Sequence, residues 1–197
     1  MLREVVLDTE TTGFFVADGH RLVSVTAIEL IDRKPTGKEF AVIVNPERDI
    51  PAETTKVHGI TDEMVKDKPV FAAAAKDLQD FIGASPIIIT CHTMKNPDGS
   101  DYVLDIDMLN MEMKKAGFKP FPASQWLNVR RWAEAMFGHD EASLNKILDH
   151  YKIDRSARDR DGHSATLDAQ LLAAAYPKLL ADYKKFKKSH RTKPPSP

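Results

Sequence analysis

Two acidic residues, Asp8 and Glu10, stand one residue apart at the end of an apolar stretch near the N-terminus. Side chains two positions apart on a strand point to the same face, so both carboxylates should project together. Carboxylates this close repel each other, and a divalent cation between them would remove that cost. Oxygen ligands favour Mg²⁺ or Mn²⁺ over a dedicated zinc site. Because the D-x-E pattern is common, the pair taken alone is better explained as surface acids.

Two further stretches carry residues that favour a shared site. Asp168 lies in an Ala- and Leu-rich helical segment, where a carboxylate faces either solvent or a cation. His163 precedes this segment beside an Asp-Gly pair, and an imidazole suits a general base at neutral pH. Asp105 and Asp107 fall in the first turn of an amphipathic segment. An exposed loop histidine and acids stabilised by the helix dipole are the alternatives, the latter more for Asp107 than for Asp105.

A mixed α/β fold must position these stretches. Hydrophobic periodicity predicts strands over 2–7, 21–31, 39–45 and 86–90, with the first three as an antiparallel meander. Helices are predicted over 71–82, 104–116, 127–137 and 143–151, with a short one capped by Thr61 and a last one from Ser164. Pro177 should kink or end the last helix. The order of elements indicates a mixed sheet flanked by helices and leaves room for one more strand among the later segments. Asp8 and Glu10 should lie at a strand's C-terminal end.

Composition restricts the classes of protein. The 197 residues suit one compact domain. A single cysteine, Cys91, excludes an intramolecular disulfide and fits a reducing cytosol, so we expect a cytoplasmic protein. No signal peptide or membrane-spanning run is evident. The net charge of −1 combines an acidic body with a basic segment beyond Asp182, and such a body binds nucleic acid only through cations or a local basic surface.

Taken together, the three stretches resemble the motifs of the DnaQ-like (DEDDh) 3′–5′ exonucleases, most of all the proofreading epsilon subunits of bacterial DNA polymerase III. The first motif appears as LDTETTG over 7–13, the second as LDIDML over 104–109 and the third as HSATLDAQLLA over 163–173. The segment VHGITDEM, over 57–64, resembles one that lines the site of the terminal nucleotide in relatives. The resemblance extends from about residue 4 to residue 176.

The resemblance implies a ribonuclease H-like fold, with a five-stranded mixed sheet between helices, in a domain over 1–183. It implies two divalent ions, Mg²⁺ or Mn²⁺, near 3.5–4 Å apart as in other two-metal sites. Asp8 would bridge both ions, Glu10 and Asp168 would complete the site of the ion that binds the attacking water, and Asp105 would hold the second ion's water shell. His163 would act as general base. Implied substrate contacts are Thr9, Thr11, Thr12, Gly13, Phe14, Val57 and His58.

The implied activity is hydrolysis of phosphodiester bonds at 3′ ends of single-stranded or frayed DNA, with release of nucleoside 5′-monophosphates. Proofreading, repair and end trimming are all compatible roles, and a DNA polymerase or another replication or repair protein is a possible partner. An exoribonuclease of the same family is the first alternative, because contacts near the 2′-hydroxyl decide between the two substrates. A non-catalytic nucleic-acid-binding relative is the second. Phe14 and Phe15 fit stacking on bases and packing in the core equally well.

Two regions depart from the family pattern. Residues 92–103 separate Cys91 from the second motif, and we expect them to form an inserted loop beside the site. Because of this insertion, Asp101 and Asp107 are alternatives to Asp105 as the acid of the second motif. Residues 184–197 are basic and contain prolines, and we expect a flexible tail there.

Overall fold

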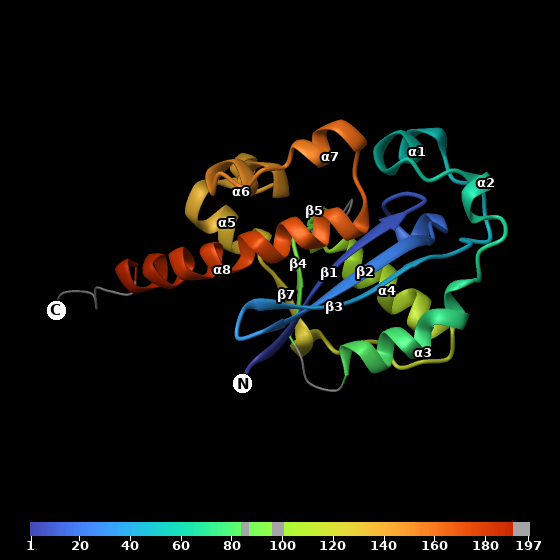
Figure 1. Ribbon diagram of the computed structural model, residues 1–197, viewed down its shortest axis with the longest axis horizontal. Coiled ribbons are helices and arrows are strands. Elements are labelled where there is room, and N and C mark those ends of the chain that lie inside the picture. Colours follow the sequence, from blue (N-terminus) through green and yellow to red (C-terminus); the bar gives the residue numbers. More distant parts are fainter. Residues whose placement is uncertain (84–86, 96–100, 191–197) are drawn as a thin grey trace.

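A five-stranded mixed sheet forms the centre of the computed structural model (Figure 1). The structure describes residues 1–83, 87–95 and 101–190. The strands of the sheet are β1 (Arg3–Thr11), β2 (Leu22–Ile31), β3 (Lys34–Ile43), β4 (Ile87–Thr90) and β7 (Trp126–Asn128). Their order is β3-β2-β1-β4-β7, in which the β1–β2 and β2–β3 pairs are antiparallel and the β1–β4 and β4–β7 pairs are parallel. The predicted mixed sheet, which begins with an antiparallel meander, is confirmed.

Helices cover both faces of this sheet (Figure 1). They are α1 (Ala52–His58), α2 (Asp62–Val65), α3 (Phe71–Ile82), α4 (Leu104–Lys115), α5 (Arg130–Phe137), α6 (Leu144–His150), α7 (Ser156–Asp161) and α8 (Ala165–Ser189). Helices α3 and α4 pack on one face, whereas α5, α6 and α8 pack on the other. The helices predicted over 71–82, 104–116 and 143–151 are confirmed to within a residue at each end. Helices α1 and α7 were not predicted, because both are short and lack a clear apolar period.

Strand β1 is buried on both sides, which explains its unbroken apolar run. Val5 and Leu7 belong to the core that contains α3 and α4. Val6 belongs to the core that contains α5, α6 and α8. Because side chains alternate along a strand, Asp8 and Glu10 continue the face of Val6 and point towards α8. The apolar part of β1 therefore fixes the direction in which its two acids project.

The helix predicted over 127–137 begins later than expected. Residues 126–128 form β7, which pairs in parallel with residues 88–90 of β4 and completes the sheet. Helix α5 starts at Arg130, where the Asn128 side-chain oxygen accepts a hydrogen bond from the Arg130 backbone N–H at 3.1 Å. Pairing with β4 thus places Leu127 and Asn128, which local sequence preference would leave in the helix, in a strand, and this corrects the prediction.

Helix α8 continues through Pro177 to Ser189, so of the two expected effects of this proline, a kink or an end, the second does not occur. Pro177 removes one backbone donor, but burial of Ala173, Tyr176 and Leu179 around it holds the helix against the core. Beyond the core, the ring of Tyr183 stacks on Trp132 of α5, with centroids 4.8 Å apart. The contact between these rings supports the helix directly before residue 184, where sequence alone placed the start of a tail.

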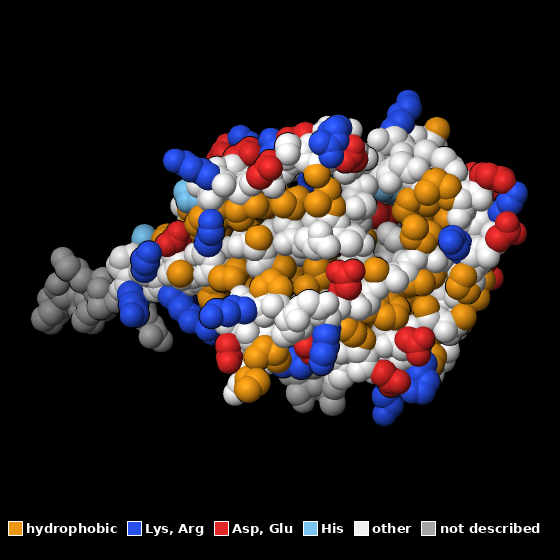
Figure 2. Space-filling view, viewed as in Figure 1, with side chains coloured by type: hydrophobic (Ala, Val, Ile, Leu, Met, Phe, Trp, Pro, Cys, Tyr) orange, Lys and Arg blue, Asp and Glu red, His pale blue; other side chains and the backbone are white. Residues whose placement is uncertain are grey.

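The basic segment that follows Asp182 is therefore largely helical. Residues 184–189 belong to α8, which corrects the expected boundary of a flexible tail, and residues 191–197 lie outside the described part. The last turns of α8 carry four lysines, Lys184, Lys185, Lys187 and Lys188. Figure 2 shows Lys and Arg side chains around this projecting end of the helix. These four basic side chains of the segment are thus carried by a helix.

The insertion at 92–103 forms a two-stranded ribbon where the structure describes it. Strand β5 (Met94–Lys95) pairs antiparallel with β6 (Asp101–Tyr102), and residues 96–100 lie outside the described part. Tyr102 anchors the ribbon, because its hydroxyl accepts a hydrogen bond from the Val16 N–H at 3.2 Å. The centroid of its ring lies 5.2 Å from that of Phe15, and Phe15 packs, partly buried, against the core. In the described part of the chain, no helix combines the length and apolarity needed to cross a bilayer.

Candidate active site

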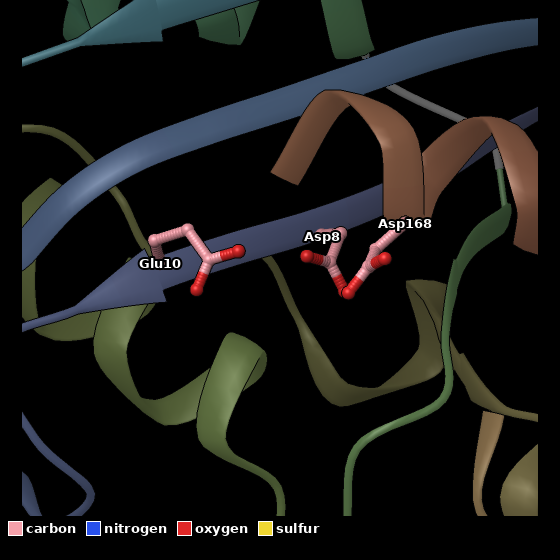
Figure 3. A group of neighbouring side chains, drawn as sticks. All are labelled: Asp8, Glu10 and Asp168. Carbon is pink, nitrogen blue, oxygen red and sulfur yellow. The ribbon is translucent and has the colours of Figure 1, made fainter. Parts of the chain in front are cut away.

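Three carboxylates from distant parts of the chain converge where β1 meets α8 (Figure 3). Asp8 and Glu10 project from β1, and Asp168 projects from the first turn of α8. One oxygen from each lies within 4.8 Å of the others. The hydroxyl of Ser164 caps α8 by accepting from the Leu167 N–H at 3.2 Å, which fixes the turn that carries Asp168.

Burial strongly affects the acid–base properties of this group. The pKa of Asp8 is raised well above its ordinary value by burial and then by the charges of Asp105, Glu10 and Asp168. The pKa of Glu10 is raised to about 8, again by burial first and then by Asp168 and Asp105. Clustered buried carboxylates are unfavourable without a positive charge, and this all-oxygen set suits Mg²⁺ or Mn²⁺. The residues present therefore fit a hard divalent cation.

Asp105 approaches the cluster from α4 on the other side of the sheet. It is 1% exposed, and its carboxylate accepts hydrogen bonds from the hydroxyls of Thr9, at 2.7 Å, and Thr90. It lies outside the group of three carboxylates but raises the pKa of Asp8 by its charge. Thr9, expected as a substrate contact, thus holds Asp105. Thr90 was missed by sequence reasoning, and its position at the end of β4 was the available signal.

Asp107, the alternative to Asp105, has a different environment. Its carboxylate accepts a hydrogen bond from the Val103 N–H at 3.2 Å, at the start of α4. Burial raises its pKa, and no metal-site partner faces it among the described residues. The side chain of Asp101, the other alternative, lies outside the described part. The structure thus places Asp107 in a helix-capping role.

The two acids of α4 should respond differently to substitution. We expect Asp105→Asn to lower the nuclease activity that the resemblance implies by about 10²-fold or more, because a buried acid beside the three carboxylates loses its charge. Asp107→Asn should stay within about threefold of wild type, since its contact is to the backbone at the helix start. Initial rates at saturating Mg²⁺ measure both, with thermal unfolding as the check on folding. Equal losses in the two variants would show that the second acid has been assigned to the wrong position.

His163 stands at the rim of the site, between α7 and α8. Its Nδ1 lies 3.4 Å from an oxygen of Asp168, and its side chain is 40% exposed. Its backbone N–H donates to the Val57 carbonyl at 3.0 Å, which ties the α7–α8 junction to α1. Gly162, with a φ of 85°, permits this turn, and a Cβ there would lie 3.2 Å from the same carbonyl. The imidazole is thus placed beside a carboxylate yet remains open to solvent.

Arg158 of α7 is a member of the site that sequence reasoning missed. Its Nε and Nη2 donate to the two oxygens of Asp168, at 2.5 and 3.0 Å, and Nη2 lies 2.8 Å from Nδ1 of His163. Burial raises the pKa of Asp168, but the contacts with His163 and Arg158 lower it by more, so it lies below its ordinary value. Arg158 lies in the charged run RSARDRD, which gives no periodic signal that one arginine faces inward.

A pocket of about 290 Å³ opens beside the carboxylates. Of the expected substrate contacts, those that line it are Thr9, Thr11, Gly13, Phe14, Val57 and His58. Phe14 and Val57 are 51% and 46% exposed, so apolar surface faces the opening. Thr12 does not line the pocket, because its hydroxyl lies 3.1 Å from the His20 ring and accepts from the Arg21 N–H. Phe14 thus lines the pocket, whereas Phe15 packs against Tyr102.

The raised pKa of Glu10 predicts a pH-dependent stability. A carboxyl whose pKa rises on folding, here from 4.5 to about 8, contributes stability below the lower value, and this contribution is lost as pH rises through the higher one. With EDTA present, we expect the Tm to fall between about pH 5 and about pH 8, and Glu10→Gln to reduce that fall. Thermal unfolding followed by circular dichroism measures it. An equally steep fall in Glu10→Gln would contradict the prediction.

The chain is similar in sequence to a known protein family and to proteins of two bacteria. The family described as Exonuclease matches residues 5–176. DNA polymerase III subunit epsilon of Rickettsia felis is 38% identical over 181 residues, which cover 90% of this chain and 74% of that protein. The subunit of the same name from Escherichia coli K12 is 33% identical over 181 residues, covering 88% of this chain and 70% of that protein.

Solved structures share the fold at lower identity. The nuclease domain of 3′hExo, a DEDDh family member bound to rAMP, gives a TM-score of 0.72 at 18% identity and covers 91% of this chain and 92% of that chain. E. coli Exonuclease I in complex with a dT13 oligonucleotide gives 0.73 at 15% identity, covering 98% of this chain and 44% of that chain. The expected ribonuclease H-like architecture is confirmed by these likenesses.

Proposed function

Because this chain belongs to the exonuclease family, as a DnaQ-like 3′–5′ exonuclease of the epsilon type, we propose that it removes nucleotides from single-stranded or frayed DNA 3′ ends with the help of two divalent ions. Mg²⁺ or Mn²⁺ would serve, and the products would be nucleoside 5′-monophosphates. The observation that carries this proposal is the convergence of Asp8, Glu10 and Asp168 to within 4.8 Å beside a pocket.

Each side chain of the site would have its own role in hydrolysis. Asp8, Glu10 and Asp168 would hold the ions, with Asp105 behind them, and bound ions activate water and stabilise charge on the phosphate oxygens. His163 stands where it can take the proton of the attacking water, since it borders Asp168 and remains partly exposed. The pocket beyond the carboxylates would receive the terminal nucleotide, with the exposed Phe14 ring available to stack on a base.

DNA is the preferred substrate class in this proposal because the curated relatives at 33–38% identity are named subunits of DNA polymerase III. By the same reasoning, a DNA polymerase is the first partner to test. A second candidate, RNA, is favoured by the structural likeness to 3′hExo bound to rAMP. Discrimination between the two would depend on contacts with the 2′-hydroxyl of the sugar.

A degradation assay tests the activity and its polarity. We expect 5′-labelled single-stranded DNA to give a ladder that shortens from the 3′ end, a duplex with a mismatched 3′ end to be degraded faster than a matched one, and EDTA to abolish both. Matched RNA of the same sequence measures the alternative substrate. Degradation that persists in EDTA, or a label released first from the 5′ end, would refute the proposal.

A further inference from the structure

Arg158 makes a set of contacts that the proposed chemistry does not explain. The residue is 7% exposed, and its guanidinium grips both oxygens of Asp168, approaches Nδ1 of His163 and donates through Nη1 to the side-chain oxygen of Asn145. We propose that Arg158 is a positioning residue that sets the affinity of the site for its metal ion, by taking the place of the cation at Asp168 and His163 until the ion displaces it. This inference rests on the proposed metal-dependent function.

The contact with Asp168 has the form expected of a competitor for a cation. Arginine is always charged and presents a planar fork that matches a carboxylate, so it neutralises Asp168 much as a metal would. Both oxygens of Asp168 are engaged, at 2.5 and 3.0 Å, and the carboxylate is 6% exposed. An ion that binds Asp168 together with Asp8 and Glu10 must therefore compete with the guanidinium for the same oxygens.

Arg158 also contacts His163, the proposed general base, so displacement of Arg158 by a metal ion would affect this residue too. Nη2 of Arg158 lies 2.8 Å from Nδ1 of His163, and this nitrogen is the one that lies 3.4 Å from an oxygen of Asp168. The guanidinium thus contacts the imidazole and the carboxylate at once. Displacement of Arg158 from Asp168 would therefore also change the surroundings of the imidazole that is proposed as general base.

Asn145 can hold the guanidinium of Arg158 after it leaves Asp168. Its side-chain oxygen accepts from Nη1, on the side of the guanidinium away from Asp168, and it belongs to α6. The guanidinium also lines the pocket that would receive the nucleotide. After an ion binds Asp168, Arg158 can keep its bond to Asn145 and remain near the pocket. Because Asp168 and Asn145 contact different sides of the guanidinium, a metal ion can replace Arg158 at Asp168 without unfolding α7.

Metal binding in the absence of nucleic acid tests this proposal. Titration of the purified protein with Mn²⁺, followed by calorimetry and by the electron paramagnetic resonance of free Mn²⁺, gives the affinity directly. We expect Arg158→Gln to bind Mn²⁺ about 10- to 100-fold more tightly than wild type, the range expected when charge-assisted hydrogen bonds no longer compete. Arg160→Gln is the matched control, because Arg160 is on the same helix but pairs with the exposed Asp161, and it should match wild type.

A second readout separates competition from simple structural support. Arg158→Gln should lower the Tm in EDTA, because the buried carboxylates lose their counter-ion, and saturating Mg²⁺ should restore most of the loss. If Arg158→Gln is poorly folded, Arg158→Lys is the second variant, since it keeps the charge but loses the fork. It should bind Mn²⁺ with an affinity between those of wild type and Arg158→Gln.

The outcomes distinguish this inference from the function on which it rests. Mn²⁺ binding that is equal or weaker in Arg158→Gln, with a Tm loss of the same size in EDTA and in Mg²⁺, would overturn the inference and leave the proposed function intact. Absence of Mn²⁺ binding in wild type, with no change in Asp168→Ala, would overturn the metal-dependent function itself. Tighter binding in Arg158→Gln together with an unchanged Arg160→Gln would support the competition.

Discussion

Replacement of Asp8 by asparagine is expected to lower the exonuclease rate by at least about 10³-fold, more than is typical for loss of a single charge-stabilising donor. Asp8 lies at the centre of the acidic cluster, because Asp105, Glu10 and Asp168 all raise its pKa by their charges. Asparagine keeps the shape but cannot supply the charged oxygens that would bridge two ions. Initial rates on single-stranded DNA at saturating Mg²⁺ measure the effect.

The same variant should fold at least as well as wild type. Burial and the neighbouring acids make the charge on Asp8 unfavourable in the metal-free protein, so its removal relieves repulsion. We expect an unchanged or higher Tm in EDTA and a smaller increase in Tm when Mg²⁺ is added. A large drop in Tm would show that the lost rate reflects unfolding, and a rate near wild type would contradict the assignment of Asp8.

Replacement of His163 by alanine should lower the rate by roughly 10²–10⁴-fold, as expected for loss of a general base. His163 reaches the site through its side chain alone, since its backbone N–H holds the Val57 carbonyl and is retained in the variant. Mn²⁺ binding should persist, because the carboxylates remain in place. Single-turnover rates measure the chemical step apart from product release.

The control for this variant is His190→Ala, in which an exposed histidine at the end of α8 is lost. It should retain the wild-type rate. Partial recovery of His163→Ala at higher pH, where hydroxide is more abundant, would agree with a lost base. A wild-type rate for His163→Ala would assign the proton transfer to another group.

The fold could be predicted from the sequence wherever the local hydrophobic pattern matches the way in which the element packs. The apolar run of β1 and the amphipathic period of α3 predicted elements that the structure contains. Residues 127–128 were predicted as helix but belong to a strand, and the helix that was expected to kink or end at Pro177 does not end there, because tertiary contacts decide both. The first joins the open edge of β4, and the second is held by the core and by the stacking of Trp132 on Tyr183. Such contacts connect residues far apart in the chain, which local patterns do not reveal.

Some residues of the site could likewise be predicted from the sequence, and others could not. Motif spacing led to Asp8, Glu10 and Asp168, and the structure brings these three together. It did not lead to Arg158 or Thr90, because their roles depend on which side chain they meet. Charged runs and single threonines are common on surfaces, so only the folded arrangement distinguishes these two residues.

The order in which Asp8 and Asp168 occur along the chain matters during synthesis on the ribosome. β1 emerges first and can pair with β2 and β3 as they appear, since domains fold from the N-terminus as translation proceeds. Helix α8, which brings the third carboxylate, follows every strand of the sheet. A nascent polypeptide that has not yet released α8 therefore lacks a full set of ligands. The order of the elements thus delays completion of the acidic cluster until nearly the whole described chain has emerged.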